Sequence, residues 1–285
     1  MDALIVQGGN NASVYFIYLK SGKVVKFADD ITDFHTTEDG GMIILLGYRG
    51  RYIVYDSILN EHLVDEKSIL PHRMSRGKIN PHAEFPNLAL FAEEQGVSVK
   101  LYNFSTKKPF PFDTNLRHPF ADNNQLVRSF NFAGADRLIL LRDKEKFIRW
   151  IDLNSGKLHQ IPVDREYNKV FTSEDGTRIG FISKDRITFI KTAQLPDFQT
   201  KAVHHDFNSE EINIDASFIG RDKVYIGTKD GKLHRGIYNL NDLNQPTFVF
   251  DSEVSPRLSF FNIKANQAFF MEYEKGQIRI EQWAK

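Results

Sequence analysis

The sequence has no cysteine among its 285 residues, and this absence excludes disulfides, cysteine-bound zinc, iron–sulfur clusters and a thiol nucleophile. It also has no excess of charge, because 37 Lys and Arg balance 37 Asp and Glu. A neutral chain lacks the long-range attraction that supplies most non-specific binding to nucleic acids. Nucleic acid is therefore the least favoured partner.

Long apolar runs are missing as well. The best uncharged apolar run, residues 42–46, is far shorter than the ~20 residues that a membrane-spanning helix needs. The first positive charge is Lys20, and the polar residues 7–11 interrupt the uncharged N-terminal stretch, so a signal peptide is not predicted. We expect a cytoplasmic protein without membrane insertion.

The sequence contains instead many short runs of β-branched and aromatic residues. Such runs occur at residues 13–19, 52–55, 147–151 and 185–190, and Gly, Asp or Asn bounds them. Almost no stretch shows helical spacing, and the 24 Phe and 10 Tyr are typical of half-buried strands. The pattern predicts an all-β chain.

The predicted strands recur with a period. An Asp or Asn turn precedes an apolar strand at seven places, about 40 to 50 residues apart. These turn residues are Asp2, Asp39, Asn87, Asp136, Asp175, Asp222 and Asn266. A second polar turn and another strand follow each of them. Four short strands per unit at this period indicate the blades of a β-propeller, in which each sheet buries its faces against its neighbours.

The seven turns favour seven four-stranded antiparallel blades in a single domain of residues 1–285, and six blades are the alternative. The first unit lacks a strand before Asp2, and the last unit ends at Trp283 without a fourth strand. We therefore expect the two termini to lie in neighbouring blades and to close the ring. In the six-bladed alternative the termini share one mixed sheet.

Three segments resemble parts of WD-repeat propellers. Trp150 and Asp152 are followed by a Ser-Gly-Lys turn, as between the third and fourth strands of that family, and residues 19–23 repeat this turn. The phrase Ser-Glu-Asp-Gly at residues 173–176 is similar to the family's Ser-Pro-Asp-Gly turn. No repeat has the family's Gly-His pair, and Ile151 separates the tryptophan from the aspartate. The resemblance implies a divergent WD-repeat-like propeller.

Two long connections are candidates for partner binding, since binding residues are often carried by loops on rigid scaffolds. The connection at residues 65–81 carries Arg73, Arg76 and Lys78. It is interpreted either as a solvated basic loop or short helix, or as a positive patch for an acidic partner or a phosphate. A positive patch would also serve the nucleic-acid hypothesis.

The connection at residues 107–124 is more apolar. It combines prolines with Phe110, Phe112, Arg117 and Phe120. Aromatic residues and arginine commonly anchor protein interfaces, so we expect a protein or peptide to bind here. The alternative is that these phenylalanines pack onto the neighbouring blades.

A third connection, residues 196–211, contains the only cluster with metal-ligand side chains: His204, His205 and Asp206. Consecutive residues of a strand point to opposite faces, so the two histidines are weak candidates for one ion. No GxSxG motif, HExxH motif or P-loop occurs. We therefore expect no cofactor and no catalytic residue.

These observations favour a non-catalytic scaffold for protein–protein interaction, or a complex subunit, that presents a rigid face made of several blades. The main alternative is a metal-dependent hydrolase or lyase that acts at the central channel of a propeller. A nucleic-acid-associated subunit is the third hypothesis. The sequence does not determine the oligomeric state.

Overall fold

A computed structural model of the chain describes most of its strands and the shorter turns. The described residues are 3–8, 12–18, 20–36, 42–47, 51–56, 61–67, 74–79, 88–93, 99–103, 108–109, 127–134, 136–142, 144–173, 175–207, 213–229, 233–250, 258–262, 266–272 and 277–283. They belong to two compact units, Met1–Val127 and Arg128–Lys285.

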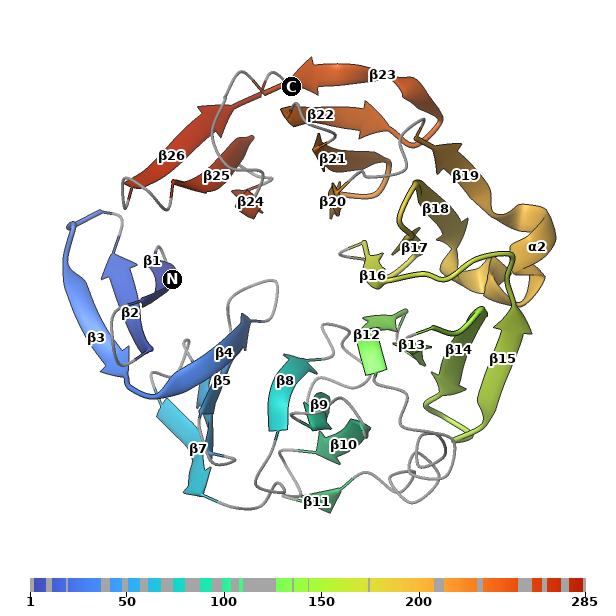
Figure 1. The fold of residues 1–285 in the computed structure, drawn as a ribbon. Coiled ribbons are helices and arrows are strands. Elements are labelled where there is room, and N and C mark those ends of the chain that lie inside the picture. The colour runs from blue at the N-terminus through green and yellow to red at the C-terminus, as the bar shows by residue number, and fades with distance from the viewer. Residues whose placement is uncertain are drawn as a thin grey trace. The chain divides into compact units, whose positions relative to one another are not determined.

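The first unit contains three antiparallel sheets within its described residues (Figure 1). One has three strands, β1 (Ala3–Gly8), β2 (Ser13–Tyr18) and β3 (Val24–Ala28). The next has four, β4 (Ile31–Thr36), β5 (Met42–Gly47), β6 (Arg51–Asp56) and β7 (Glu61–Lys67). The third has β8 (Met74–Ile79), β9 (Leu88–Glu93), β10 (Val99–Asn103) and β11 (Lys108–Pro109).

The second unit contains three four-stranded antiparallel sheets and one three-stranded sheet within its described residues (Figure 1). The first sheet consists of β12 (Val127–Ala133), β13 (Arg137–Arg142), β14 (Phe147–Asp152) and β15 (Leu158–Pro162). The second consists of β16 (Lys169–Thr172), β17 (Arg178–Ile182), β18 (Arg186–Lys191) and β19 (Val203–Asp206). The third consists of β20 (Asn213–Ile219), β21 (Lys223–Lys229), β22 (Leu233–Asn239) and β23 (Asp242–Val249). The three-stranded sheet consists of β24 (Leu258–Asn262), β25 (Gln267–Glu272) and β26 (Gln277–Gln282).

In each sheet the strands follow one another in chain order, or in its reverse. The seven strands that the Asp and Asn turns predict are β1, β5, β9, β13, β17, β21 and β25. Each of these is the second strand of its sheet in chain order, except β1, which begins its sheet. The all-β prediction and its period are therefore confirmed. The terminal strands lie in two separate three-stranded sheets, and not in one mixed sheet.

The apolar cores lie between successive sheets. In the second unit, one cluster joins Ile139 and Trp150 of one sheet to Phe181 and Ile190 of the next. A second cluster joins the sheet β16–β19 to the sheet β20–β23, and a third joins that sheet to β24–β26. In the first unit a similar cluster joins β2 to β5 and β6. In these four clusters neighbouring sheets bury apolar side chains against each other, as sheets too small to cover themselves require.

The turn that resembles WD repeats has the predicted place between a third and a fourth strand. Asp152, the last residue of β14, accepts backbone hydrogen bonds from Asn154 (2.9 Å) and Ser155 (2.8 Å). Gly156 follows with φ of 71°, a conformation that glycine adopts without steric cost. Trp150 is buried and stacks on His159 of β15, with ring centroids 4.9 Å apart.

Two of the predicted long connections are shorter in the structure. The segment 65–81 is not one loop, because its ends belong to β7 and β8. The segment 196–211 contains the end of a 3₁₀ helix, η2 (Thr192–Asp197), a short helix, α2 (Phe198–Lys201), and β19. No helix in the part of the chain that the structure describes is long and apolar enough to cross a membrane.

Candidate functional site

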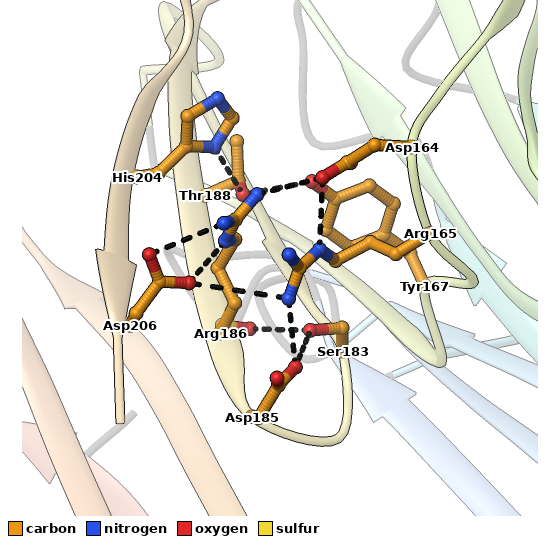
Figure 2. A network of polar contacts seen from close by, with 9 residues as sticks. All are labelled: Asp164, Arg165, Tyr167, Ser183, Asp185, Arg186, Thr188, His204 and Asp206. Carbon is orange, nitrogen blue, oxygen red and sulfur yellow. Dashed lines mark hydrogen bonds and ion pairs between the residues drawn. The ribbon is translucent and has the colours of Figure 1, made fainter. Parts of the chain in front are cut away.

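One edge of the sheet β16–β19 gathers charged side chains from three segments. They come from the segment that leads from β15 into β16, from the turn between β17 and β18 with the start of β18, and from β19. Figure 2 shows these side chains pointing toward one another. We call this group the Arg165–Arg186 network; its members are Asp164, Arg165, Tyr167, Ser183, Asp185, Arg186, Thr188, His204 and Asp206.

Arg186 connects all three segments. The register of β18 and β19 places it opposite Asp206, and its Nε and Nη2 donate to both carboxylate oxygens, with Nη2 3.1 Å from Oδ2. Its Nη1 donates to Asp164 Oδ2 at 3.0 Å. A guanidinium that makes such a bidentate contact with a carboxylate is held in one orientation.

Arg165 makes the second set of contacts. Its Nε donates to Asp164 Oδ2 at 3.2 Å, and its Nη1 donates to Asp185 Oδ1 at 2.8 Å. The hydroxyl of Ser183 also donates to Asp185 Oδ1, at 3.2 Å, which fixes this carboxylate in the tight turn before β18. The second ion pair of Arg165 Nη1 is with Asp206, at 3.9 Å. Three carboxylates therefore hold two guanidiniums.

A chain of hydrogen bonds runs from the interior to this edge. The hydroxyl of Tyr167 lies 2.9 Å from Thr188 Oγ1, and Thr188 Oγ1 lies 2.9 Å from His204 Nδ1. Tyr167 and Thr188 are buried, whereas His204 reaches the surface. When His204 is neutral at Nδ1, each hydroxyl can donate to the next group, so both buried hydroxyl protons have acceptors.

The charges shift the titration of these groups. The hydrogen bond from Arg186 lowers the pKa of Asp206, and the same bond raises the pKa of Arg186. Burial acts to raise the pKa of Asp164, but the hydrogen bond and charge of Arg165 outweigh it, and the pKa is lowered. Burial, followed by the positive charge of Arg186, lowers the pKa of His204. The carboxylates thus stay ionised and the imidazole stays neutral over a wider pH range.

The network stands on a rigid base. Backbone hydrogen bonds join its three segments, from Asn168 N to Ile182 O (2.6 Å) and from Phe207 N to Asp185 O (2.8 Å). Beneath it, the buried ring of Tyr167 packs against Phe181 and Phe198, with ring centroids 5.6 and 6.1 Å apart. The side chains of Arg165 and Arg186 are 24% and 15% exposed, whereas those of the three aspartates are about half exposed. The face presented to solvent is a fixed pattern of carboxylate oxygens around two arginines.

The neighbouring sheet contributes to the same edge. The backbone N–H of Lys144, in the turn between β13 and β14, donates to Glu166 Oε1 at 3.1 Å. Arg128 of β12 lies 3.8 Å from the same oxygen. The turn of one sheet is therefore tied to the segment that enters the next sheet, beside Arg165.

The three metal-ligand candidates do not converge. His204 and Asp206 lie opposite Thr188 and Arg186, whereas His205 lies between them and points to the other face, against Phe207. Both carboxylate oxygens of Asp206 accept hydrogen bonds from Arg186. Among the residues that the structure describes, no group of three His, Asp or Glu is placed to hold a metal ion.

The partner-binding candidates lie mostly outside the described residues. This holds for Arg73, Phe110, Phe112, Arg117 and Phe120. The backbones of Arg76 and Lys78 belong to β8, where they lie opposite Ala92 and Leu90 of β9. These two residues are thus on a strand rather than in a loop.

A shallow hollow of about 320 Å³ lies near two of the predicted Asp turns. Arg137, Asp175, Thr177, Lys191 and Thr192 are among the residues that line it. Their polar atoms mainly hold the turns together: Asp175 accepts from Ser173 Oγ at 2.7 Å and from the Thr177 backbone at 3.0 Å, and Arg137 donates to the carbonyl of Thr192. This hollow is therefore less developed as a binding site than the Arg165–Arg186 network.

Neither a protein-family model nor a curated protein matches the sequence. A solved structure does match: the β-propeller domain of Cps50 (Swd1) from Myceliophteria thermophila, with a TM-score of 0.70. The match covers 98% of this chain and 92% of that one, at 12% sequence identity. The fold is that of a β-propeller. At this identity the likeness concerns the fold alone, so the role of the propeller has to be argued from its own residues.

Proposed function

We propose that this propeller is a non-catalytic scaffold for protein–protein interaction, or a complex subunit, and that the Arg165–Arg186 network is part of its binding face. The carrying observation is the preorganised charge pattern, in which three half-exposed carboxylates hold two guanidiniums in fixed positions. A partner that binds such a face loses little freedom of the scaffold's side chains, which lowers the cost of association. The partner is expected to be another protein or a peptide.

A second contact region is proposed on the first unit. It consists of the basic and aromatic residues Arg73, Arg76, Lys78, Phe110, Phe112, Arg117 and Phe120. Arginine and phenylalanine are frequent anchors of interfaces, and this composition supports the proposal.

We further propose that the sheets are seven blades of one domain, residues 1–285, and that the two three-stranded terminal sheets close the ring. The recurrence of a second strand at each Asp or Asn turn supports this arrangement, and so does a likeness that extends over nearly the whole chain. Cytoplasmic location and the lack of catalysis stay predictions.

Affinity purification from native cells, followed by calorimetry with the purified partner, tests the proposal. The variant Asp164→Asn with Asp206→Asn removes both charges that hold Arg186 and leaves Asp185 as the one carboxylate of the network. We expect partner binding to fall about tenfold or more, because Arg186 loses its fixed orientation and Arg165 keeps Asp185 as its one carboxylate partner in the network. A second arm replaces Arg76 and Lys78 with glutamate and tests the region on the first unit separately.

The matched control is Asp222→Asn, which breaks a single exposed ion pair with Arg178 (3.3 Å) away from the network. This control should bind as the wild type does. Thermal melting establishes that each variant is folded before binding is compared. If the folded double variant binds every partner with wild-type affinity, the network is not part of the binding face.

A further inference from the structure

A line of three polar groups leads from the surface of the Arg165–Arg186 network into its apolar base. His204 of β19 is exposed, Thr188 of β18 is fully buried, and Tyr167 is 2% exposed. Two gaps of 2.9 Å separate Nδ1 of His204, Oγ1 of Thr188 and the hydroxyl oxygen of Tyr167 (Figure 2). Both gaps have the length of a hydrogen bond, so each holds one proton between its two heavy atoms.

The number of protons on this line depends on His204. Tyr167 and Thr188 contribute one hydroxyl proton each, and an imidazole nitrogen without a proton only accepts. Two protons then fill two gaps, because Tyr167 donates to Thr188 and Thr188 donates to His204. A third proton, on Nδ1, exceeds the number of gaps, since Thr188 is the one hydrogen-bond partner of the Tyr167 hydroxyl among the described residues. The line therefore matches an imidazole whose Nδ1 is unprotonated.

Protonation of Nδ1 reverses the line. A charged imidazolium N–H makes the stronger hydrogen bond, so Thr188 Oγ1 becomes its acceptor. The Thr188 proton then points to the Tyr167 oxygen, and the Tyr167 proton loses its acceptor. The surroundings of this proton are apolar, because the ring of Tyr167 packs against those of Phe181 and Phe198, and Phe198 also contacts His204 with ring centroids 6.4 Å apart. A buried hydroxyl proton without an acceptor is unfavourable, so the folded protein opposes this step until the pH falls.

The charged groups that face His204 act on the same step. Arg186 of β18 and Arg165 of the segment before β16 repel a charged imidazole, whereas Asp164 and Asp206 attract it. Burial is the largest cause, and together these contributions lower the pKa of His204 from its usual 6.5. The proton count and the surroundings of the imidazole therefore act in the same direction.

We propose that His204 is a proton-controlled switch of the Arg165–Arg186 network, in which uptake of one proton at Nδ1 reverses both hydrogen bonds of the line. The proton comes from solvent, which the exposed imidazole contacts. Tyr167 belongs to the segment that carries Arg165, and His204 belongs to the strand that carries Asp206, so the switch joins two sides of the network. Its effect on a partner rests on the proposed function, because protonation raises the charge of the binding face by one.

Histidine NMR of the full chain tests the state of the line at neutral pH. Long-range proton–nitrogen correlation identifies the tautomer of His204, and the variant His204→Gln assigns its signals. We expect the neutral imidazole to carry its proton on Nε2, and the midpoint of its titration to lie below the usual 6.5. A proton on Nδ1 of the neutral ring, or a midpoint at or above 6.5, overturns the proposal.

Raman spectroscopy tests the reversal itself. The intensity ratio of the tyrosine ring doublet distinguishes a phenol hydroxyl that donates a hydrogen bond from one that accepts it. Subtraction of the spectrum of Tyr167→Phe leaves the signal of Tyr167. We expect Tyr167 to change from donor to acceptor as the pH falls, with the midpoint that NMR gives for His204. Near-ultraviolet circular dichroism establishes that the protein is folded at each pH.

Two variants separate the switch from a general effect of acid. Thr188→Val keeps the shape of the buried side chain and removes its hydroxyl, so the Tyr167 signal should no longer follow the titration of His204. The matched control His205→Gln should respond as the wild type does, because His205 points to the other face of β19, against Phe207. A wild-type Tyr167 signal that stays constant while His204 titrates, or a change that persists in Thr188→Val, overturns the proposal.

The link to binding is measured separately from the switch. Calorimetry with the partner purified from native cells compares the wild type with His204→Gln at pH values on either side of the midpoint. We expect the affinity of the wild type to change more between these pH values than that of the variant. If Tyr167 reverses but the two proteins bind alike at both pH values, the switch stands and its link to the binding face is overturned.

Discussion

The sheets β16–β19 and β24–β26 lie in the same unit and differ in how their edges are completed. The first has a short fourth strand, and two arginines tie that strand to the sheet and to the segment that precedes β16. The second has three strands within the described residues, and β26 is the outer one. The comparison indicates that charged side chains fasten the outer strand of the first sheet, whereas the described part of the second sheet contains no such fourth strand.

The outer strand of the first sheet also defines a kind of surface. Around Arg186 the backbone of β18 is paired with that of β19, and the surface presents fixed charges that partly neutralise one another. This is the surface that we propose to contact a partner through charge complementarity.

The largest expected effect concerns the packed base of the complete sheet. Phe181 is fully buried between Tyr167 and Phe198. Phe181→Ala should lower the free energy of unfolding by about 3–5 kcal/mol, because it removes buried apolar surface and leaves a cavity. Urea unfolding measures the change. A loss below about 1 kcal/mol would show that the network does not stand on a tightly packed base.

The next effect concerns the tie between β18, β19 and the segment before β16. Arg186→Ala should lower the free energy of unfolding by about 1–3 kcal/mol, since Asp164 and Asp206 each lose one of their two charged partners. Arg178→Ala is the matched control in the same sheet, because Arg178 has one exposed ion pair with Asp222, and its cost should be at most about 1 kcal/mol. Equal costs for both variants would contradict the role assigned to the network.

A smaller effect is expected from pH. The pKa of His204 is lowered from its usual 6.5, so the folded state binds fewer protons than the unfolded state just below that pH. Stability from this group is therefore fully present above pH 6.5 and is lost as the pH falls through the folded pKa. Replacement of His204 by Gln should flatten this part of the stability curve, measured by thermal melting. The burial of His205 lowers its pKa too and is unchanged in the variant, so the difference between the two curves reports on His204.

The smallest effect is expected at Ile280 of β26. Ile280→Ser should change the free energy of unfolding by no more than about 0.5 kcal/mol in dilute protein, because the side chain is more than half exposed. Trp283→Ala, three residues further on, removes a buried ring and should cost about 3–5 kcal/mol. A large loss for Ile280→Ser would mean that Ile280 is buried in the folded protein.

The positions of the second strands could be predicted because turns depend on local chemistry. An Asp or Asn followed by an apolar run identified β13, β17 and β21 without any knowledge of their neighbours. β8 was missed for the same reason, since Met-Ser-Arg-Gly-Lys-Ile has no apolar run and reads as a loop. Its strand character comes from pairing with β9.

The Arg165–Arg186 network could not be predicted from the sequence. Arg186 and Asp206 are 20 residues apart, and the short helices η2 and α2 lie between them. Only the register of β18 and β19 brings the two side chains together. A rule that looks for alternating Arg and Asp at strand ends would have found the residues, but not their contacts.

The sequence by itself determined that the chain is all-β, that its strands recur with a period, and that thiol chemistry is excluded. These properties depend on composition and on turns of a few residues. The tertiary structure decided which charges meet at the edge of β16–β19. Strand pairing joins residues far apart in the chain, and its register, which no local pattern contains, places every side chain on one face or the other.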